Sequence, residues 1–288
     1  MKIQQGRVSI KEGIVIGEGG GRSLEADVFL PPLEEKNRPA VLFIHGGGWS
    51  EGDRSQLRGY GILLARLGFV CMCNSYRLSN ESIWPAQIQD VNCAIRYLRA
   101  NATDLGLDPD RIGVSGNSAG GHLSLTTGML PESADMDRQC PGNRRRAWST
   151  GETSTEELKV AAIINWYGIT DVADSLHRKP GPSGAYTVAW LGSSSDREDI
   201  AQKVSPLTYV RRGLPPTLTI HGDADPIVPY EHAVRLHEAL DDVGVPNELV
   251  TVPGGGHGGF TIEENLRIYA SIRSFLSAHG LPTPATNE

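Results

Sequence analysis

The stretch Gly113-Val114-Ser115-Gly116-Asn117-Ser118-Ala119-Gly120-Gly121 limits most strongly what this 288-residue chain can fold into. It contains Gly-x-Ser-x-Gly centred on Ser118, with an apolar run before it and a helix-compatible run after it. That is the strand–turn–helix setting of a nucleophile elbow. So sharp a turn strains the serine backbone, and Gly116 and Gly120 would let neighbouring chain pass close by. Alone, the pattern also fits an ordinary Gly/Ser turn between a strand and a helix.

The overall charge and hydropathy indicate a soluble globular chain. The formal net charge of -7 argues against a nucleic-acid surface, and Arg144-Arg145-Arg146 lies in a polar segment that predicts a solvated loop. No apolar run approaches the roughly 20 residues of a membrane span. Residues 1–6 lack the apolar core of a secretory signal. We therefore expect a cytoplasmic protein that binds neither nucleic acid nor membrane, and its oligomeric state stays open.

The four cysteines show no spacing typical of a metal site. They are Cys71, Cys73, Cys93 and Cys140, and none pairs with histidines at the intervals that metal ligands adopt. We expect them to be reduced, with the first three in the core. No metal and no cofactor is predicted.

The hydrophobic pattern predicts eight strands. Segments 8–16 and 23–30 alternate apolar and polar residues around a Gly-rich turn, which indicates an antiparallel hairpin. The turn is not a phosphate loop, because it joins two strands and lacks the Lys-Ser/Thr ending. Further strands are expected at 40–44, 69–73, 111–114, 160–166, 217–221 and 248–252. Helical spacing follows at 57–67, 87–102, 232–240 and 264–279, and Asp108-Pro109-Asp110 is predicted to be a turn.

Alternating strands and helices predict an α/β protein with a mostly parallel sheet and helices on both faces. We expect one domain over residues 1–288, with a surface insertion at 131–157, where the sequence is polar and has no clear periodicity. In open sheets of this kind ligands bind beyond the carboxyl ends of the strands. The residues that follow the predicted strands directly include the loop 45–49, Ser118, Asp225 and His257.

The chain resembles the α/β-hydrolase superfamily over essentially its whole length. His45-Gly46-Gly47-Gly48-Trp49 upstream of Gly-x-Ser-Ala-Gly is similar to the hormone-sensitive-lipase-like esterases. Tyr76-Arg77-Leu78-Ser79 and the stretches 163–171 and 221–229 bring it closer to the feruloyl/acetyl-xylan-esterase-like (BD-FAE) group. The chain departs from the hormone-sensitive-lipase-like pattern at Asn117, where those enzymes usually have Asp, and in its acid motif. The resemblance implies the α/β-hydrolase fold with an eight-stranded sheet.

Acyl transfer needs a nucleophile, a base, an orienting acid and an anion-binding site. In this fold the chain order is Ser, then Asp or Glu, then His, which suits Ser118, Asp225 and His257. His279 is a weaker rival as the base. Asp223 competes with Asp225 after the same strand, and the resemblance to His-Gly-x-x-Asp-x-x-Val-Pro favours Asp225.

The oxyanion hole is expected to use backbone N–H groups. One would come from Ala119, the residue after the nucleophile, and the others from the loop after the first buried strand. By resemblance these are Gly47 and Gly48, with Gly46 as an alternative, and His45 would brace the loop. Four aromatic residues lie near strand ends, where they either line a pocket or pack in the core: Trp49, Trp84, Trp166 and Tyr167.

The leading hypothesis is a serine carboxylesterase that acts on small acyl esters through an acyl-enzyme. Acetyl and feruloyl esters are targets that the resemblance suggests. Two alternatives stay open: a serine peptidase of the oligopeptidase type, and a non-catalytic ligand-binding protein on a hydrolase scaffold. The expected partner is a small-molecule ester.

Overall fold

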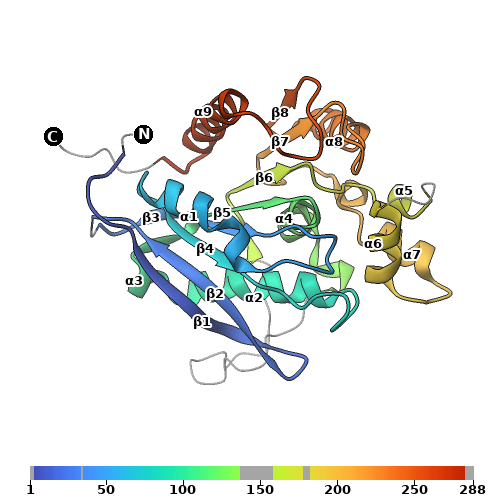
Figure 1. Ribbon diagram of the computed structural model, residues 1–288, viewed down its shortest axis with the longest axis horizontal. Coiled ribbons are helices and arrows are strands. Elements are labelled where there is room, and N and C mark those ends of the chain that lie inside the picture. The colour runs from blue at the N-terminus through green and yellow to red at the C-terminus, as the bar shows by residue number, and fades with distance from the viewer. Residues whose placement is uncertain (1–2, 34, 137–157, 178–181, 283–288) are drawn as a thin grey trace.

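The computed structural model describes residues 3–33, 35–136, 158–177 and 182–282 (Figure 1). Eight strands in these ranges join one sheet in the order β1-β2-β4-β3-β5-β6-β7-β8. The predicted α/β-hydrolase sheet is confirmed. Its strands are β1 (Ser9–Gly19), β2 (Arg22–Leu30), β3 (Arg38–Ile44), β4 (Val70–Asn74), β5 (Leu107–Asn117), β6 (Ala162–Trp166), β7 (Thr217–Gly222) and β8 (Asn247–Val252).

The sheet is antiparallel only at its N-terminal edge. β1 pairs with β2, and β2 with β4, in antiparallel fashion, whereas β4, β3, β5, β6, β7 and β8 are parallel to one another. All the parallel strands therefore end at one edge of the sheet. This is the edge from which the loops after β3, β5, β7 and β8 project, and these loops carry the predicted site residues.

Helices cover both faces of the sheet. In β3, Ala40, Leu42 and Ile44 pack into one buried cluster, and Val41 and Phe43 into another, because successive side chains of a strand point to opposite faces. The first cluster includes apolar residues of α2 (Ala86–Ala100), α4 (Ala119–Met129) and α8 (Glu231–Asp242). The second includes those of α1 (Arg58–Ala65) and α9 (Ile262–Ala278).

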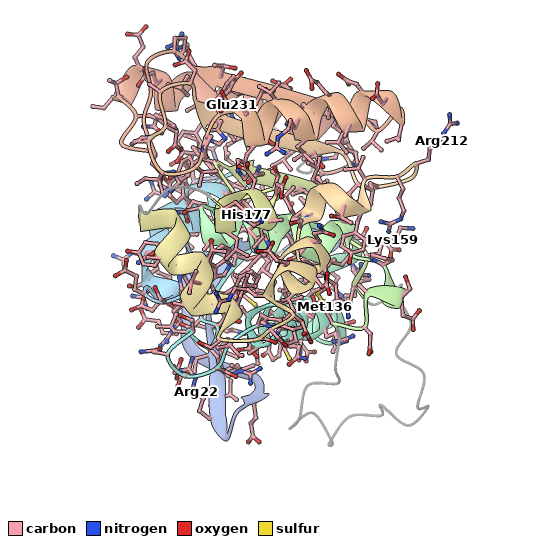
Figure 2. The ribbon with its side chains drawn as sticks, turned by 90° about the vertical axis from the view of Figure 1, so that its right-hand side faces the viewer. Arg22, Met136, Lys159, His177, Arg212 and Glu231 are labelled. Atoms are coloured by element: carbon pink, nitrogen blue, oxygen red, sulfur yellow. The ribbon has the colours of Figure 1, made fainter. Side chains whose placement is uncertain are left out.

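Three short helices gather at the end of the molecule away from the hairpin, on the right in Figure 1. They are α5 (Val172–His177), α6 (Pro182–Leu191) and α7 (Arg197–Lys203). Figure 2 looks onto this side, where His177 marks the last residue of α5. The remaining short elements are η1 (Arg54–Leu57), α3 (Ala102–Leu105), η2 (Glu132–Ala134) and η4 (Pro206–Tyr209).

The expected turn at Asp108-Pro109-Asp110 is wrong, because these residues belong to β5. Leu107 already pairs with Arg38 of β3, and an irregularity in that pairing follows before Ala40 meets Ile112. The extra residues bulge from the start of the strand, where Pro109 and Asp110 are exposed. Turn-forming residues therefore extend the strand here.

The cysteines follow the sequence prediction in part. Cys71, Cys73 and Cys93 are buried, as expected, and Cys71 and Cys73 are free thiols. Cys93 is disulfide-bonded, so the prediction that it is reduced is wrong. Spacing along the chain does not reveal which thiols meet in space. Cys140 and the greater part of the predicted insertion lie outside the described residues. No helix in the described ranges is long and apolar enough to span a membrane.

Three buried histidines predict a fold that loses stability in acid. Burial lowers the pKa of His45, His122 and His232 to about 4 each, below the ordinary value of 6.5. Between these pH values the unfolded chain binds protons that the folded chain does not, so stability falls by up to about 1.4 kcal/mol per pH unit for each histidine. Urea denaturation from pH 7 to 4 should show this decline.

The His122→Gln variant is the matched control, because it removes one of these titrating groups. The slope of its unfolding free energy against pH should be smaller than that of the wild type. The difference should reach up to about 1.4 kcal/mol per pH unit, the contribution of one proton. Equal slopes for the two proteins over this window would contradict the prediction.

Candidate active site

Ser118 lies at a strained turn between β5 and α4. Its φ of 55° and ψ of -120° fall outside the regions that a residue with a side chain normally adopts. A Cβ on Gly116 would lie 2.3 Å from the Gly120 carbonyl oxygen, and one on Gly120 would lie 2.0 Å from that of Ile44. Only glycine fits at either position. The elbow is therefore pressed against the end of β3, as the Gly-x-Ser-x-Gly pattern predicts.

Three predicted residues meet at the carboxyl edge of the sheet. The Ser118 hydroxyl lies 2.9 Å from Nε2 of His257, and Nδ1 of His257 lies 2.7 Å from Oδ2 of Asp225. Asp225 comes from the loop after β7, and His257 from the Gly-rich loop after β8. Since Nδ1 faces a carboxylate, it carries the imidazole hydrogen, and Nε2 is left to accept the serine proton.

The side chain of Asp225 has no exposed surface. Oδ1 accepts hydrogen bonds from the N–H groups of Ile227 (2.8 Å) and Val228 (3.0 Å). Burial raises the pKa of the carboxyl, but hydrogen bonds from His221 and His257, and the backbone donor at Ile227, outweigh burial and hold the pKa below its usual range. The carboxylate therefore stays charged at neutral pH and can stabilise a protonated His257.

The two rival residues have other contacts. Asp223 Oδ1 accepts a hydrogen bond from Gly254 N (2.6 Å), which joins the loops after β7 and β8. The ring of His279 packs on Phe275 at the end of α9, with ring centroids 4.5 Å apart. The structure thus brings Asp225 and His257, rather than Asp223 or His279, to Ser118.

The loop after β3 presents free backbone donors next to Ser118. The N–H groups of Gly47, Gly48 and Ala119 have no hydrogen-bond partner among the described residues. Gly46 N–H instead donates to Asn117 Oδ1 (3.1 Å), which removes Gly46 as an alternative. Gly47 and Gly48 have φ of 107° and 55°, in the left-handed region that favours glycine.

His45 and Tyr76 fix the orientation of this loop. The buried His45 donates from Nδ1 to the Gly46 carbonyl (2.8 Å), and its ring stacks on Tyr76 at 4.1 Å. Tyr76 Oη donates to the carbonyl of His45 (3.0 Å). In a trans peptide the C=O and the next N–H point in opposite directions, so fixing the Gly46 oxygen turns the Gly47 N–H away from His45. This is the bracing expected of His45.

Asn117 is a residue whose role the sequence alone did not explain. Its side chain accepts the Gly46 N–H and also forms a hydrogen bond with Tyr167. Tyr167 in turn packs on the ring of His257, with centroids 4.6 Å apart. Asn117 therefore links the elbow, the glycine loop and the residue beside the base. The sequence signal for this role was the amide residue itself, which stands at the end of the strand directly before the serine.

A cavity of about 300 Å³ opens onto Ser118 and His257. Its buried walls are formed by Trp49, Ile169, Thr187 and Val228. Tyr186 of α6 lies over Gly48, and its hydroxyl donates to Glu51 Oε1 at 3.4 Å.

The four aromatic residues singled out in the sequence divide between the cavity and the core. Trp49 and Tyr167 line the cavity, and Trp49 also belongs to the first buried cluster. Trp166 instead packs near Tyr60 and Tyr269, and Trp84 packs against the core. Whether each of these residues lines the cavity or packs in the core depends on neighbours that lie far away in the sequence.

A protein-family model decides the affiliation of this chain. The BD-FAE model matches residues 26–240, the greater part of the sequence, from within β2 to within α8. The chain belongs to the BD-FAE family. The match ends before His257, which the structure nevertheless places beside Ser118.

Two relatives of this BD-FAE member are named as esterases. Esterase LipC of Mycobacterium tuberculosis is 33% identical over 235 residues, which cover 78% of this chain and 54% of LipC. Esterase LipQ of the same organism is 29% identical over 86% of this chain and 57% of its own length. The chain thus spans little more than half the length of these curated relatives.

Solved esterase structures share the fold over almost its whole extent. Thermogutta terrifontis esterase 2 phosphorylated by paraoxon has a TM-score of 0.76 and 27% identity, with 96% of both chains covered. A truncated form of a carbohydrate esterase from gut microbiota has a TM-score of 0.75 and 28% identity, with 93% of this chain and 96% of that chain covered.

The Asn117 contacts predict a measurable effect on turnover. In Asn117→Ala the Gly46 N–H loses its acceptor, so the glycine loop is held less firmly. We expect kcat for p-nitrophenyl acetate to fall about 10-fold, which corresponds to one hydrogen bond. Asn117→Asp keeps an oxygen acceptor and should retain more activity than Asn117→Ala. Equal activity of wild type and Asn117→Ala would show that the contact has no role in turnover.

Proposed function

We propose that this BD-FAE member is a serine carboxylesterase that hydrolyses small acyl esters through an acyl-enzyme on Ser118. The observation that carries the proposal is the continuous Ser118–His257–Asp225 contact beside the N–H groups of Gly47, Gly48 and Ala119, which have no partner in the described part of the chain. The esterase names of its relatives and structural neighbours support the same reaction class. A ligand-binding scaffold would not require a serine hydroxyl within reach of a correctly oriented imidazole.

In the acylation step, Ser118 Oγ attacks the ester carbonyl carbon. His257 Nε2 takes the hydroxyl proton, and Asp225 stabilises the imidazolium that forms. The carbonyl oxygen becomes an oxyanion that accepts hydrogen bonds from Ala119 and the glycine loop, each typically contributing about 2.7–4 kcal/mol. The C–O bond to the alcohol then breaks, and the alcohol leaves with the proton from His257.

Deacylation repeats the sequence with water as the nucleophile. His257 takes one proton from the water as its oxygen attacks the acyl carbon, and the same N–H groups stabilise the second oxyanion. The bond from the carbon to Ser118 Oγ breaks, and Oγ regains its proton from His257. The products are the free acid and the original enzyme, so no other reactant is required.

The size of the cavity supports short acyl substrates. A volume of about 300 Å³ lies at the lower end of ligand pockets in general. Tyr186 limits it on one side, because its ring lies so close to Gly48 that a Cβ there would be 2.4 Å from Tyr186 Cγ. An acetyl group fits such a space more readily than an octanoyl group.

The proposed partner is therefore a small-molecule ester, with no role for nucleic acid or membrane. A cytoplasmic location stays a prediction from the sequence. The disulfide at Cys93 weighs against it, because such bonds persist mainly in oxidising compartments.

A panel of p-nitrophenyl esters from acetyl to octanoyl, with methyl ferulate, acetylated xylan and a peptide p-nitroanilide, tests the function. We expect kcat/KM to be highest for short acyl esters and the anilide to be a poor substrate. Ser118→Ala should lose at least 1,000-fold in kcat, since its nucleophile is absent. Full turnover by this variant, or a preference for the anilide, would reject the proposal.

The same panel tests the cavity wall with Tyr186→Ala. Removing the ring opens the space beside Gly48, so the ratio of octanoyl to acetyl kcat/KM should rise. Tyr186→Phe keeps the ring and loses only the hydrogen bond to Glu51, so it should keep the wild-type ratio. An unchanged ratio in Tyr186→Ala would place the acyl group elsewhere.

A further inference from the structure

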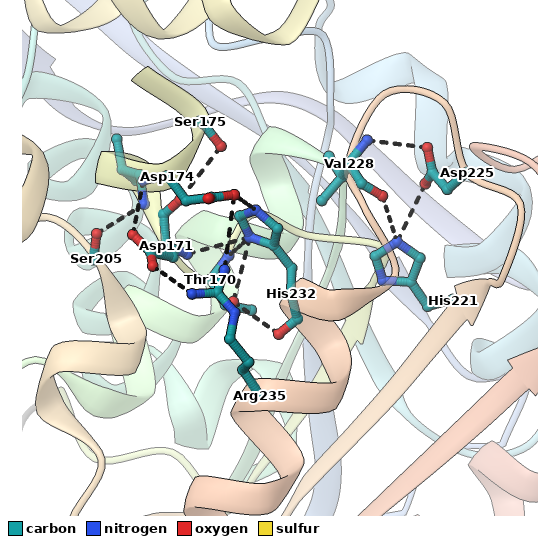
Figure 3. A network of polar contacts seen from close by, with 11 residues as sticks. Thr170, Asp171, Asp174, Ser175, Ser205, His221, Asp225, Val228, His232 and Arg235 are labelled. Atoms are coloured by element: carbon teal, nitrogen blue, oxygen red, sulfur yellow. Dashed lines mark hydrogen bonds and ion pairs between the residues drawn. The ribbon is translucent and has the colours of Figure 1, made fainter. Parts of the chain in front are cut away.

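A second histidine, His221, contacts the acid of the proposed triad. It lies in β7, has no exposed surface, and points Nε2 at Asp225 Oδ2 (3.3 Å) and at the Val228 carbonyl (2.8 Å) (Figure 3). None of the proposed reaction steps uses this side chain.

The neighbours of His221 fix its tautomer. Both atoms that face Nε2 are acceptors, a carboxylate oxygen and a carbonyl oxygen, so Nε2 carries the hydrogen and shares it between them. Nδ1 is buried and has no hydrogen-bond partner within the described part of the chain. His221 therefore acts here as a donor through Nε2.

The contact completes the hydrogen bonding of a buried charge. Oδ1 of Asp225 has two backbone donors, whereas Oδ2 has His257 and His221. A buried charge that loses a donor costs more than the bond itself contributed, because the solvent cannot replace the donor. Asp225 Oδ2 is the oxygen that orients His257. Without His221, its one remaining donor among the described residues would be His257 itself.

The same donor closes the turn that holds the acid. Val228 donates its N–H to Asp225 Oδ1, and its carbonyl accepts from His221. His221 thereby holds the turn. It is itself part of β7 and pairs with Thr251 of β8 inside the sheet. Because Val228 also lines the cavity, His221 connects the acid and the cavity wall to a rigid strand.

We propose that His221 is a positioning residue for the esterase reaction, which holds the Asp225 carboxylate in the direction that orients His257. The inference rests on the proposed function, since it assigns His221 a role only through Asp225. The His221 side chain does not line the substrate cavity itself.

The first test replaces His221 by Phe and by Gln. His221→Phe keeps a ring that can pack on Tyr230, now 5.8 Å away, but has no donor. We expect its kcat for p-nitrophenyl acetate to fall at least 10-fold while KM changes less than about 3-fold, the loss expected for a hydrogen bond to a charged group. His221→Gln places an amide N–H near the position of Nε2 and should restore most of kcat.

A double-mutant cycle separates this role from a general loss of structure. If His221 acts through the carboxylate, His221→Phe should change kcat less than about 2-fold in an Asp225→Ala background. An equal loss in both backgrounds, or wild-type kcat in His221→Phe alone, would overturn the proposal. Activity retained by Ser118→Ala would overturn the proposed function instead, so the two failures can be told apart.

The wild-type protein provides a measurement should His221→Phe fail to fold. Nitrogen NMR of ¹⁵N-histidine-labelled protein should show His221 with its hydrogen on Nε2, assigned by the loss of that signal in His221→Gln. A His221 ring with its hydrogen only on Nδ1 would leave Asp225 and Val228 without this donor and would contradict the proposal.

Discussion

The positive φ of Ser118 is the constraint on which the site depends. The elbow keeps this conformation because Gly116 and Gly120 pack without side chains against the end of β3. The glycine loop continues from that same strand end, so one contact sets both the position of the hydroxyl and the place of the expected oxyanion donors. Strain of this kind persists only where the surroundings determine it, here a sheet buried on both faces.

Around the elbow, polar groups are arranged to leave particular atoms free. Asn117 accepts the Gly46 N–H, and His45 donates to the Gly46 carbonyl, whereas the N–H groups of the next two glycines have no partner among the described residues. Asp225 receives four donors, two from backbone and two from imidazoles, so its charge is stabilised although it is buried. The resulting direction of His257 leaves Nε2 facing Ser118. Nucleophile, base and acid are thus each fixed by contacts from different loops.

The sequence predicted the sheet and the edge at which its loops meet, because apolar runs and chain order determine which loops share an edge. The choice of Asp225 over Asp223 as the partner of Ser118 and His257 came from the family resemblance. It did not predict what depends on contacts in space. Asn117 and His221 matter through partners that a linear pattern does not connect. The start of β5 at Leu107 depends on pairing with β3, and the disulfide at Cys93 depends on an approach that spacing does not reveal. Tyr186 reaches the cavity from a helix with no motif of its own.

Mass spectrometry after incubation with paraoxon tests the central claim, that the elbow presents Ser118 as an activated nucleophile. We expect one diethylphosphoryl group per chain, on the peptide that contains Ser118, and much slower labelling in His257→Ala. An adduct on a different residue, or labelling at the same rate without His257, would contradict it.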